Sequence, residues 1–176
     1  NAVSGYSGGG KKMIESYEAA GSAAIPYLPY GLTFAHKHLP EMQRYAMLAH
    51  APVFQPAVGN YAQGMLGAVP VFGELLVKRA TGEAVRDCLA ETYDGSPVIE
   101  VAPYAEIERL ESISPEVLNN TNRMRLHVFS NELRGHLLLM AIYDNLGKGA
   151  SGAAVQNLNI MIGAEETLGT DLTQAS

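Results

Sequence analysis

The fold of this chain is constrained most by an unbroken apolar run, residues 137–142, that leads directly into a glycine-rich segment, residues 143–152. Apolar residues then recur at helical spacing as far as Ile162. A short apolar run, a glycine-rich turn and a 3.6-residue period together indicate a strand, a loop and a helix. The spacing predicts that one face of this helix is buried, formed by Ala150, Ala153, Ala154, Leu158, Met161 and Ile162.

The glycine-rich segment has two possible roles at the start of this helix. Free N–H groups and the positive end of the helix dipole attract anions there, and glycines let a ligand approach the backbone closely. Lys148 would add a full positive charge. These features favour an anion or cofactor site. The alternative is a tight turn whose glycines serve packing alone.

A second glycine-rich segment, residues 4–12, ends on Lys11 and Lys12. It follows the end of a strand at residues 2–3, and a short helix is predicted over residues 13–20. Phosphate binding is one interpretation of serines, glycines and lysines in this order. The segment matches neither a Walker A loop nor a dinucleotide-binding fingerprint, because the spacing of the glycines and lysines does not fit. A flexible turn is the favoured interpretation.

Two histidines, His36 and His38, lie in residues 31–38, which are extended in character. In a strand both rings would project from the same face. A helix is predicted to follow directly, with Pro40 at its first position and Glu41 in its first turn. This pattern permits metal ligation, which needs a further ligand elsewhere. It also permits acid–base chemistry in which the carboxylate orients an imidazole. The alternative is that both histidines cap a strand end.

The remaining pattern predicts a layered domain. Strands are predicted over residues 53–56, 64–72, 98–101 and 123–129, and a helix over residues 81–93. The connection from 123–129 to the apolar strand is short, which implies antiparallel pairing. Pro70 suggests an edge or a bulge in its strand. Several strands, some paired through short connections, with helices on one face, predict an α+β fold with a mixed, largely antiparallel sheet.

Composition narrows the functional classes. With 176 residues the chain can form one domain with a substantial core. The net charge of −6 argues against nucleic acid or an anionic membrane as the main partner. No apolar run approaches the ~20 residues that span a bilayer, and no targeting segment is recognised. The single cysteine, Cys88, excludes an internal disulfide, which fits a cytoplasmic protein. We interpret Cys88 as a small buried hydrophobe rather than a nucleophile.

Three segments in order carry a family resemblance: residues 1–11 with Tyr-Ser-Gly-Gly-Gly, residues 29–41 with His-Lys-His-Leu-Pro-Glu, and residues 144–157 with Gly-Ala-Ser-Gly-Ala-Ala. Together they closely resemble the N-acetyl-gamma-glutamyl-phosphate reductases of arginine biosynthesis, in the shorter second type of that family. The resemblance runs from Asn1 to about Gly163.

Members of this family have two domains. A Rossmann-like nucleotide-binding domain precedes a catalytic and oligomerising α+β domain, which is like the second domain of glyceraldehyde-3-phosphate and aspartate-semialdehyde dehydrogenases. The resemblance therefore implies that residues 1–163 are the catalytic, substrate-binding and oligomerisation domain and that residues 164–176 are a flexible tail. It also implies that the chain is a piece of something longer, without the N-terminal NADP domain.

The resemblance further implies NADPH-dependent reduction of N-acetyl-gamma-glutamyl phosphate to N-acetylglutamate semialdehyde and phosphate. In the family a cysteine attacks the acyl phosphate, phosphate leaves, NADPH reduces the thioester, and a histidine handles protons. The implied catalytic residues are His38 with Glu41, and His36 as the substitute for His38. The implied substrate-binding residues are Tyr30, Ser4 and Gly5. The implied cofactor-binding residues are Asn145, Lys148 and Gly149. NADP is the implied cofactor, no metal is implied, and the implied partners are the acyl-phosphate substrate and further copies of the chain.

One departure from the family pattern limits what this chain can do. The family's nucleophile lies in a Gly-Cys-Tyr-Pro-Thr type motif upstream of the serine-glycine loop, and this chain has no such motif. Cys88 stands in an unrelated context. The chain alone is therefore predicted to be inactive. The alternatives are an inert binding or oligomerisation module of the same fold, and a reductase of a related acyl phosphate, either aspartyl phosphate or the lysine-route analogue.

Overall fold

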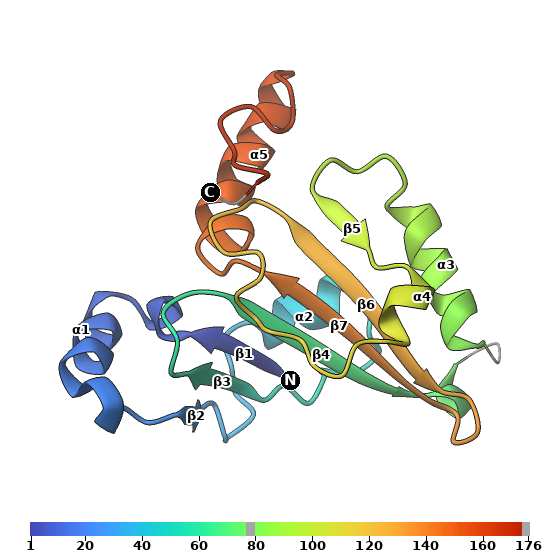
Figure 1. The fold of residues 1–176 in the computed structure, drawn as a ribbon, viewed down its shortest axis with the longest axis horizontal. Coiled ribbons are helices and arrows are strands. Elements are labelled where there is room, and N and C mark those ends of the chain that lie inside the picture. Colours follow the sequence, from blue (N-terminus) through green and yellow to red (C-terminus); the bar gives the residue numbers. More distant parts are fainter. Residues whose placement is uncertain (77–79, 174–176) are drawn as a thin grey trace.

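The computed structural model describes residues 1–76 and 80–173. These residues form a seven-stranded sheet in the order β2-β3-β1-β4-β7-β6-β5 (Figure 1). The strands are β1 (Ala2–Gly5), β2 (Tyr27–Pro29), β3 (Pro56–Gly59), β4 (Met65–Phe72), β5 (Ile99–Val101), β6 (Met124–Asn131) and β7 (His136–Tyr143). The helices are α1 (Lys11–Ala20), α2 (Leu39–Tyr45), α3 (Gly82–Thr92), α4 (Tyr104–Ile107) and α5 (Gly152–Ile162), with a π-helical turn, Gly147–Ser151, directly before α5.

The sheet is mixed and largely antiparallel, as predicted. β1 pairs with β3 and β5 pairs with β6 in parallel, and the other four neighbouring pairs are antiparallel. β6 and β7 form a hairpin in which Met124 lies opposite Tyr143. This confirms the pairing expected from the short connection. Gly135 in the hairpin turn has φ +63°, a conformation that glycine adopts without steric strain.

Helices α1 and α3 cover one face of the sheet. The register places Val58 of β3 and Ser130 of β6 on the same face, because residues directly opposite share a face and alternate residues return to it. Tyr17 of α1 packs with Val58 in a buried cluster. Gly82 of α3 lies so close to Ser130 that a side chain at Gly82 would collide with it. For these two helices, the predicted packing on one face is confirmed.

The apolar run of residues 137–142 lies in strand β7, between β4 and β6. Ile142 of β7 and Val128 of β6 are almost completely buried. Pro70 lies in β4 beyond the three residues that pair with β1, so its missing N–H faces no strand on that side. At Pro70, β4 is therefore an edge strand on the side of β1, as expected for a proline. Nearer its start, β4 lies between β1 and β7.

The predicted buried face of helix α5 is wrong. Leu158, Met161 and Ile162 are 54%, 83% and 68% exposed, whereas the polar Gln156 and Asn159 are buried. The helix projects away from the sheet rather than lying on it (Figure 1), so its apolar residues have no layer beneath them. The helix predicted from the apolar spacing is present. The described residues supply no surface that covers its apolar side.

The predicted strand through the two histidines is also wrong. Residues 31–38 form turns, closed by a bond from the Phe34 N–H to the Gly31 oxygen and one from the Leu39 N–H to the His36 oxygen. Gly31 and Phe34 both have positive φ, which lies outside the range of regular β-strands. The strand predicted over residues 53–56 begins only at Pro56, where pairing with Ala2 of β1 starts.

Cys88 is exposed on α3, so its interpretation as a buried hydrophobe is wrong. Helix α3 turns Gly82, Val85 and Leu89 inward. Cys88 lies one residue before Leu89, about 100° around the helix, and thus faces outward. None of the described helices is long and apolar enough to cross a membrane.

The segment after α5 lies against that helix. The Asn159 amide donates to the backbone oxygens of Glu166 and Leu168, at 3.1 and 2.8 Å, and the Gln156 amide donates to the Glu166 carboxylate at 2.7 Å. Residues 174–176 of the predicted flexible tail lie outside the described residues. Flexibility of the tail stays a prediction. Amide hydrogen exchange of residues 164–173 at unprotected rates would confirm it, and strong protection would contradict it.

Protonation of one buried histidine is expected to destabilise the fold. His127 of β6 is 2% exposed, and its Nδ1 has no hydrogen-bond partner among the described residues. Burial lowers the pKa of His127, and the charge of Arg125 lowers it further, against the opposite effect of Glu106 and Glu100. Between the folded-state pKa and the unfolded value of about 6.5, the unfolded chain binds more protons, so the free energy of unfolding falls as pH decreases.

Urea unfolding at several pH values checks this expectation. The slope contributed by His127 is at most about 1.4 kcal/mol per pH unit, the limit for one proton. His127→Phe should remove that slope, whereas the matched change of the exposed His50 should leave it unchanged. An equal slope in wild type and His127→Phe would contradict the assignment.

Candidate active site

A cavity of about 550 Å³ lies over the part of the sheet formed by β3, β1 and β4. Its walls include glycines of the segment after β1, apolar residues of the sheet, and the segment that carries the two histidines. Six of the residues selected from the sequence line it: Ser4, Tyr30, His36, His38, Asn145 and Gly149. The structure thus gathers three segments that are far apart in the chain around one cavity.

His38 and Glu41 form the central contact of this site. His38 stands at the N-terminal boundary of α2, and Pro40 and Glu41 occupy the first turn. The His38 Nδ1 lies 2.9 Å from Glu41 Oε2. A proton on Nδ1 directed at this carboxylate leaves the lone pair of Nε2 available, which is the arrangement of an imidazole base. Both side chains are about half exposed or more, at 52% and 66%.

His36 supports His38 rather than duplicating it. The His36 ring lies 5.1 Å from the His38 ring, 5.2 Å from Phe54 and 5.7 Å from Tyr30, measured between ring centres. Its Nδ1 accepts a hydrogen bond of 3.3 Å from the backbone N–H of His38. Desolvation lowers the pKa of His36, and the positive charges of His38 and Lys37 lower it further. A neutral His36 ring can keep accepting this hydrogen bond.

The three predicted substrate-binding residues differ in the groups that they present to the cavity. Tyr30 lines the cavity, and burial raises the pKa of its hydroxyl, so it is a neutral donor. The Ser4 hydroxyl lines the cavity and donates to the neighbouring Gly5 oxygen at 3.1 Å. Gly5 does not line the cavity: a Cβ there would lie 2.6 Å from the Ala62 oxygen and the Gln63 nitrogen, so glycine is needed for close backbone approach.

Lys148 and the glycine-rich turn serve contacts inside the fold. The Lys148 amine does not line the cavity and donates to Gln156 Oε1 at 2.6 Å. Desolvation lowers the pKa of Lys148, against the opposite effect of Glu166. Side chains at Gly147 and Gly152 would collide with the Thr121 oxygen and the Asn122 amide. These glycines have the packing role given above as the alternative, while Gly149 reaches the cavity.

Sequence reasoning missed the role of Asp144. It is 1% exposed, and its carboxylate accepts hydrogen bonds from the backbone N–H groups of Asn120 and Leu146, each at 2.8 Å, and from the Gln63 amide. It therefore joins the end of β7, the turn around Asn120 and the segment before β4. The only available signal was an aspartate directly after an apolar strand, which does not reveal partners 24 and 81 residues away.

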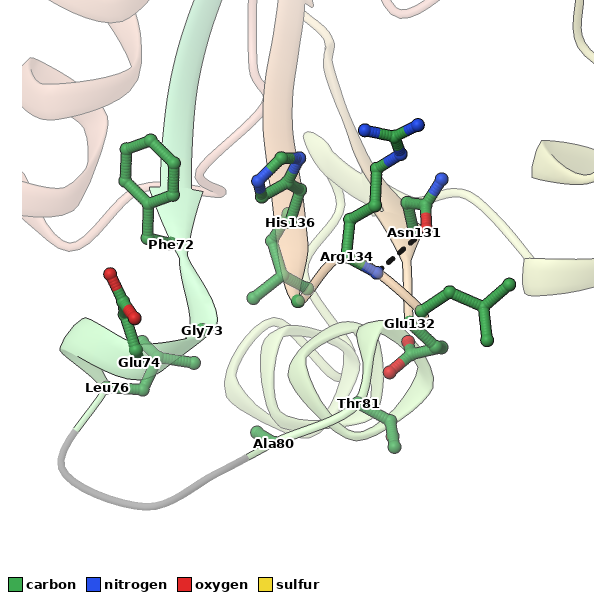
Figure 2. Close-up of a pocket in the computed structure, with 13 residues that line it drawn as sticks. Phe72, Gly73, Glu74, Leu76, Ala80, Thr81, Asn131, Glu132, Arg134 and His136 are labelled. Atoms are coloured by element: carbon green, nitrogen blue, oxygen red, sulfur yellow. Dashed lines mark hydrogen bonds between the residues drawn. The ribbon is translucent and has the colours of Figure 1, made fainter.

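A larger cavity, about 880 Å³, lies at the opposite end of β4, β6 and β7 (Figure 2). Two of its polar side chains have partners within the fold: Glu132 accepts from the Gly82 N–H at 2.8 Å, and His136 contacts the Phe72 ring edge to face. None of the residues selected from the sequence lines it. Over residues 1–76 and 80–173, no three His, Cys, Asp or Glu side chains are grouped as metal ligands. The smaller cavity, which six of the selected residues line, is therefore the candidate active site.

Comparison with known proteins agrees with this architecture. A family model described as semialdehyde dehydrogenase, dimerisation domain, matches residues 1–145. The chain belongs to this family. The matched region ends at Asn145, between the end of β7 and the turn Gly147–Ser151.

Similar sequences and structures place this member of the family more narrowly. An N-acetyl-gamma-glutamyl-phosphate reductase of Mesorhizobium japonicum is 53% identical over 165 residues, which are 93% of this chain and 54% of that protein. The reductase of the same name from Burkholderia ambifaria is 51% identical, over 93% of this chain and 52% of that protein. The chain thus spans about half the length of the curated relatives it matches.

Solved structures share the fold of this semialdehyde dehydrogenase domain. Aspartate semialdehyde dehydrogenase II of Vibrio cholerae superposes with a TM-score of 0.64 at 18% identity, over 92% of this chain and 54% of that one. The Francisella tularensis enzyme gives a TM-score of 0.54 at 17% identity, over 77% of this chain and 39% of that one. At these identities the likeness concerns the fold, and it confirms the α+β architecture expected from the sequence.

Proposed function

We propose that this chain is the catalytic and oligomerisation domain of an NADPH-dependent reductase that converts N-acetyl-gamma-glutamyl phosphate to N-acetylglutamate semialdehyde and phosphate, in arginine biosynthesis. The observation that carries the proposal is the convergence of Ser4, Tyr30, His36, His38, Asn145 and Gly149 on one cavity. The names of relatives about 50% identical over nearly the whole chain support it.

His38 is the acid–base residue in this proposal. Glu41 holds Nδ1, so Nε2 would accept the proton of a cysteine thiol as its sulfur attacks the acyl carbon and phosphate leaves. In this proposal the cysteine would lie in the part of the protein that this chain does not span. Tyr30 and Ser4 would contact the substrate as neutral hydrogen-bonding groups. His36 would stay neutral and hold the backbone of His38.

The residues present fit one end of the NADP cofactor only. Asn145 and Gly149 line the cavity and would lie against the nicotinamide, whereas Lys148 is bonded to Gln156 outside it. When bound, NADPH supplies the hydride that reduces the thioester. The part of the cofactor beyond the nicotinamide would be held by the N-terminal nucleotide-binding domain.

That second domain would cover helix α5. The exposed apolar residues Leu158, Met161 and Ile162 form a surface that burial would stabilise. The helix starts beside the cavity and lies beyond residues 1–145, the part matched by the dimerisation-domain model. We therefore place the nucleotide-binding domain against α5, and we expect the present chain alone to be inactive.

The face of the sheet opposite α1 and α3 would form the homo-oligomer interface. Pro70, Phe72, Phe129 and Leu138 line a shallow apolar depression on it. Phe72 is 54% exposed. Apolar patches of this kind mark protein–protein contacts, and a dimerisation domain requires such a surface.

Phe72→Glu is expected to convert a dimer to a monomer at micromolar concentration without unfolding the chain, because it places a charge in the interface at an exposed position. Sedimentation velocity measures the change. Val53→Glu, at a side chain that is 82% exposed and does not line the depression, is the matched control. A Phe72→Glu variant that remains dimeric would exclude this face as the interface.

The reverse reaction tests the proposed function directly. Full-length protein and this chain would each receive N-acetylglutamate semialdehyde, phosphate and NADP, and NADPH formation would be followed by absorbance. We expect activity in the full-length protein and none in this chain. Silence in both would favour the inert-module alternative or a related acyl phosphate. Activity in this chain alone would contradict the missing nucleophile and return attention to Cys88.

A further inference from the structure

Asn145 uses its side chain to join two segments that lie far from it in the chain. Its Oδ1 accepts a hydrogen bond of 2.8 Å from the Gly64 N–H, and its Nδ2 donates one of 2.9 Å to the Ser7 hydroxyl. The first partner precedes β4, and the second follows β1. Both ends of the amide therefore hold a protein partner, and one Nδ2 hydrogen and one Oδ1 lone pair are left for a ligand.

These attachments meet at one end of three adjacent strands. Ser4 near the end of β1 lies opposite Met65 at the start of β4, and Met65 lies opposite Tyr143 at the end of β7. Asn145 lies two residues after the end of β7, and its side chain reaches the segment after β1 and the segment before β4. Contacts that extend across the sheet in this way fix the relative position of segments whose connecting chain does not constrain them.

The segment held by Asn145 forms a wall of the active-site cavity. Backbone bonds already tie it to the segment before β4: the N–H groups of Tyr6 and Ser7 donate to the Tyr61 and Ala62 oxygens at 2.9 and 3.1 Å. Gly8 and Gly9 continue the segment and line the cavity. At Gly8 a Cβ would lie 2.8 Å from the Ser4 hydroxyl, so the fit is close.

We propose that Asn145 is a positioning residue that clamps residues 6–9 to the start of β4, and so sets the cavity wall formed by Gly8 and Gly9 beside the catalytic histidines. This goes beyond the cofactor contact expected for Asn145 and rests on the proposed reductase function for its effect on rate. A displacement of about 1 Å in such a wall can lower the rate by about 10²-fold.

Hydrogen exchange and kinetics on the full-length protein test the clamp together. In Asn145→Ala we expect the amides of Ser7 and Gly64 to exchange about tenfold faster, and kcat/KM to fall by about 10- to 100-fold, mainly through kcat. Asn145→Asp should restore protection, because one oxygen still accepts from Gly64 and the Ser7 hydroxyl can turn to donate to the other. Asn60→Ala, at an exposed amide that does not line the cavity, is the matched control.

A double-mutant cycle separates the clamp from a direct ligand contact. Ser7→Ala should reproduce part of the loss, and Asn145→Ala should cost less in the Ser7→Ala background than in wild type. If Asn145→Ala fails to fold, Ser7→Ala alone provides the exchange readout. Unchanged exchange with a raised KM for NADPH would overturn the clamp and leave a cofactor ligand. Faster exchange in a protein without reductase activity would support the clamp and refute the proposed function.

Discussion

Replacing His38 with alanine in the full-length protein is expected to lower kcat by about 10²–10⁴-fold, with little change in KM for the acyl phosphate. The reason is the geometry of the pair: the Glu41 carboxylate lies 2.9 Å from His38 Nδ1, so the imidazole is oriented with Nε2 available for proton transfer. An alanine leaves the cavity walls in place and removes only the group that moves the proton. Steady-state kinetics with saturating cofactor measures both parameters.

Two further variants make this test specific. His36→Ala should reduce kcat less than His38→Ala, because His36 acts through a backbone contact to His38. His50→Ala is the matched control, since His50 is exposed and lies outside the cavity. A loss of less than tenfold in His38→Ala would contradict the assignment. A larger loss in His36→Ala would transfer the acid–base role to His36.

Replacing Asp144 with alanine is expected to reduce the free energy of unfolding by about 3 kcal/mol or more. The carboxylate is 1% exposed and is the common acceptor for Asn120, Leu146 and Gln63. Its removal takes the acceptor from the Asn120 and Leu146 N–H groups and leaves the Gln63 amide with its longer contact to Asn120 Oδ1, at 3.2 Å. Each donor left unsatisfied costs about 1–3 kcal/mol. Urea denaturation with an unchanged m-value gives the difference directly.

The matched control is Asp94→Ala, at an exposed aspartate in the turn after α3. It should change stability by less than about 0.5 kcal/mol, as surface substitutions usually do. Asp144→Asn should fall between the two, because one oxygen still accepts while the new amide hydrogens lack acceptors. A loss below about 1 kcal/mol in Asp144→Ala would show that water replaces the carboxylate at this junction.

The strands and the hairpin were predictable because their signals are local. The apolar run of β7, the alternation of β6 and the short connection between them all act within about a dozen residues, the range over which side-chain period and turn length determine pairing. The same holds for the start of α2, where Pro40 and Glu41 occupy the positions that suit a helix N-terminus. The His38–Glu41 contact followed from this local geometry.

The geometry around the histidines was not predictable from the same kind of signal. Residues 31–38 contain strand-forming residues, yet Gly31 and Phe34 adopt positive φ and the segment turns. The turn brings the rings of His36 and His38 within 5.1 Å, so the juxtaposition expected from a strand arises by another route. In the turn the His36 ring contacts the rings of Tyr30 and Phe54, and strand preference in the sequence does not reveal such contacts.

By itself, the sequence determined most of the helices and strands, the mixed sheet, the family and six residues that line the candidate site, because each rests on local spacing or on motifs in order. Only the tertiary structure decided which side of α5 is buried, that Lys148 turns to Gln156, and that Asp144 and Asn145 hold distant segments together. A periodic pattern shows that a helix has an apolar side but not what covers it. A single polar residue shows that it needs partners, and only the folded chain brings those partners within hydrogen-bonding distance.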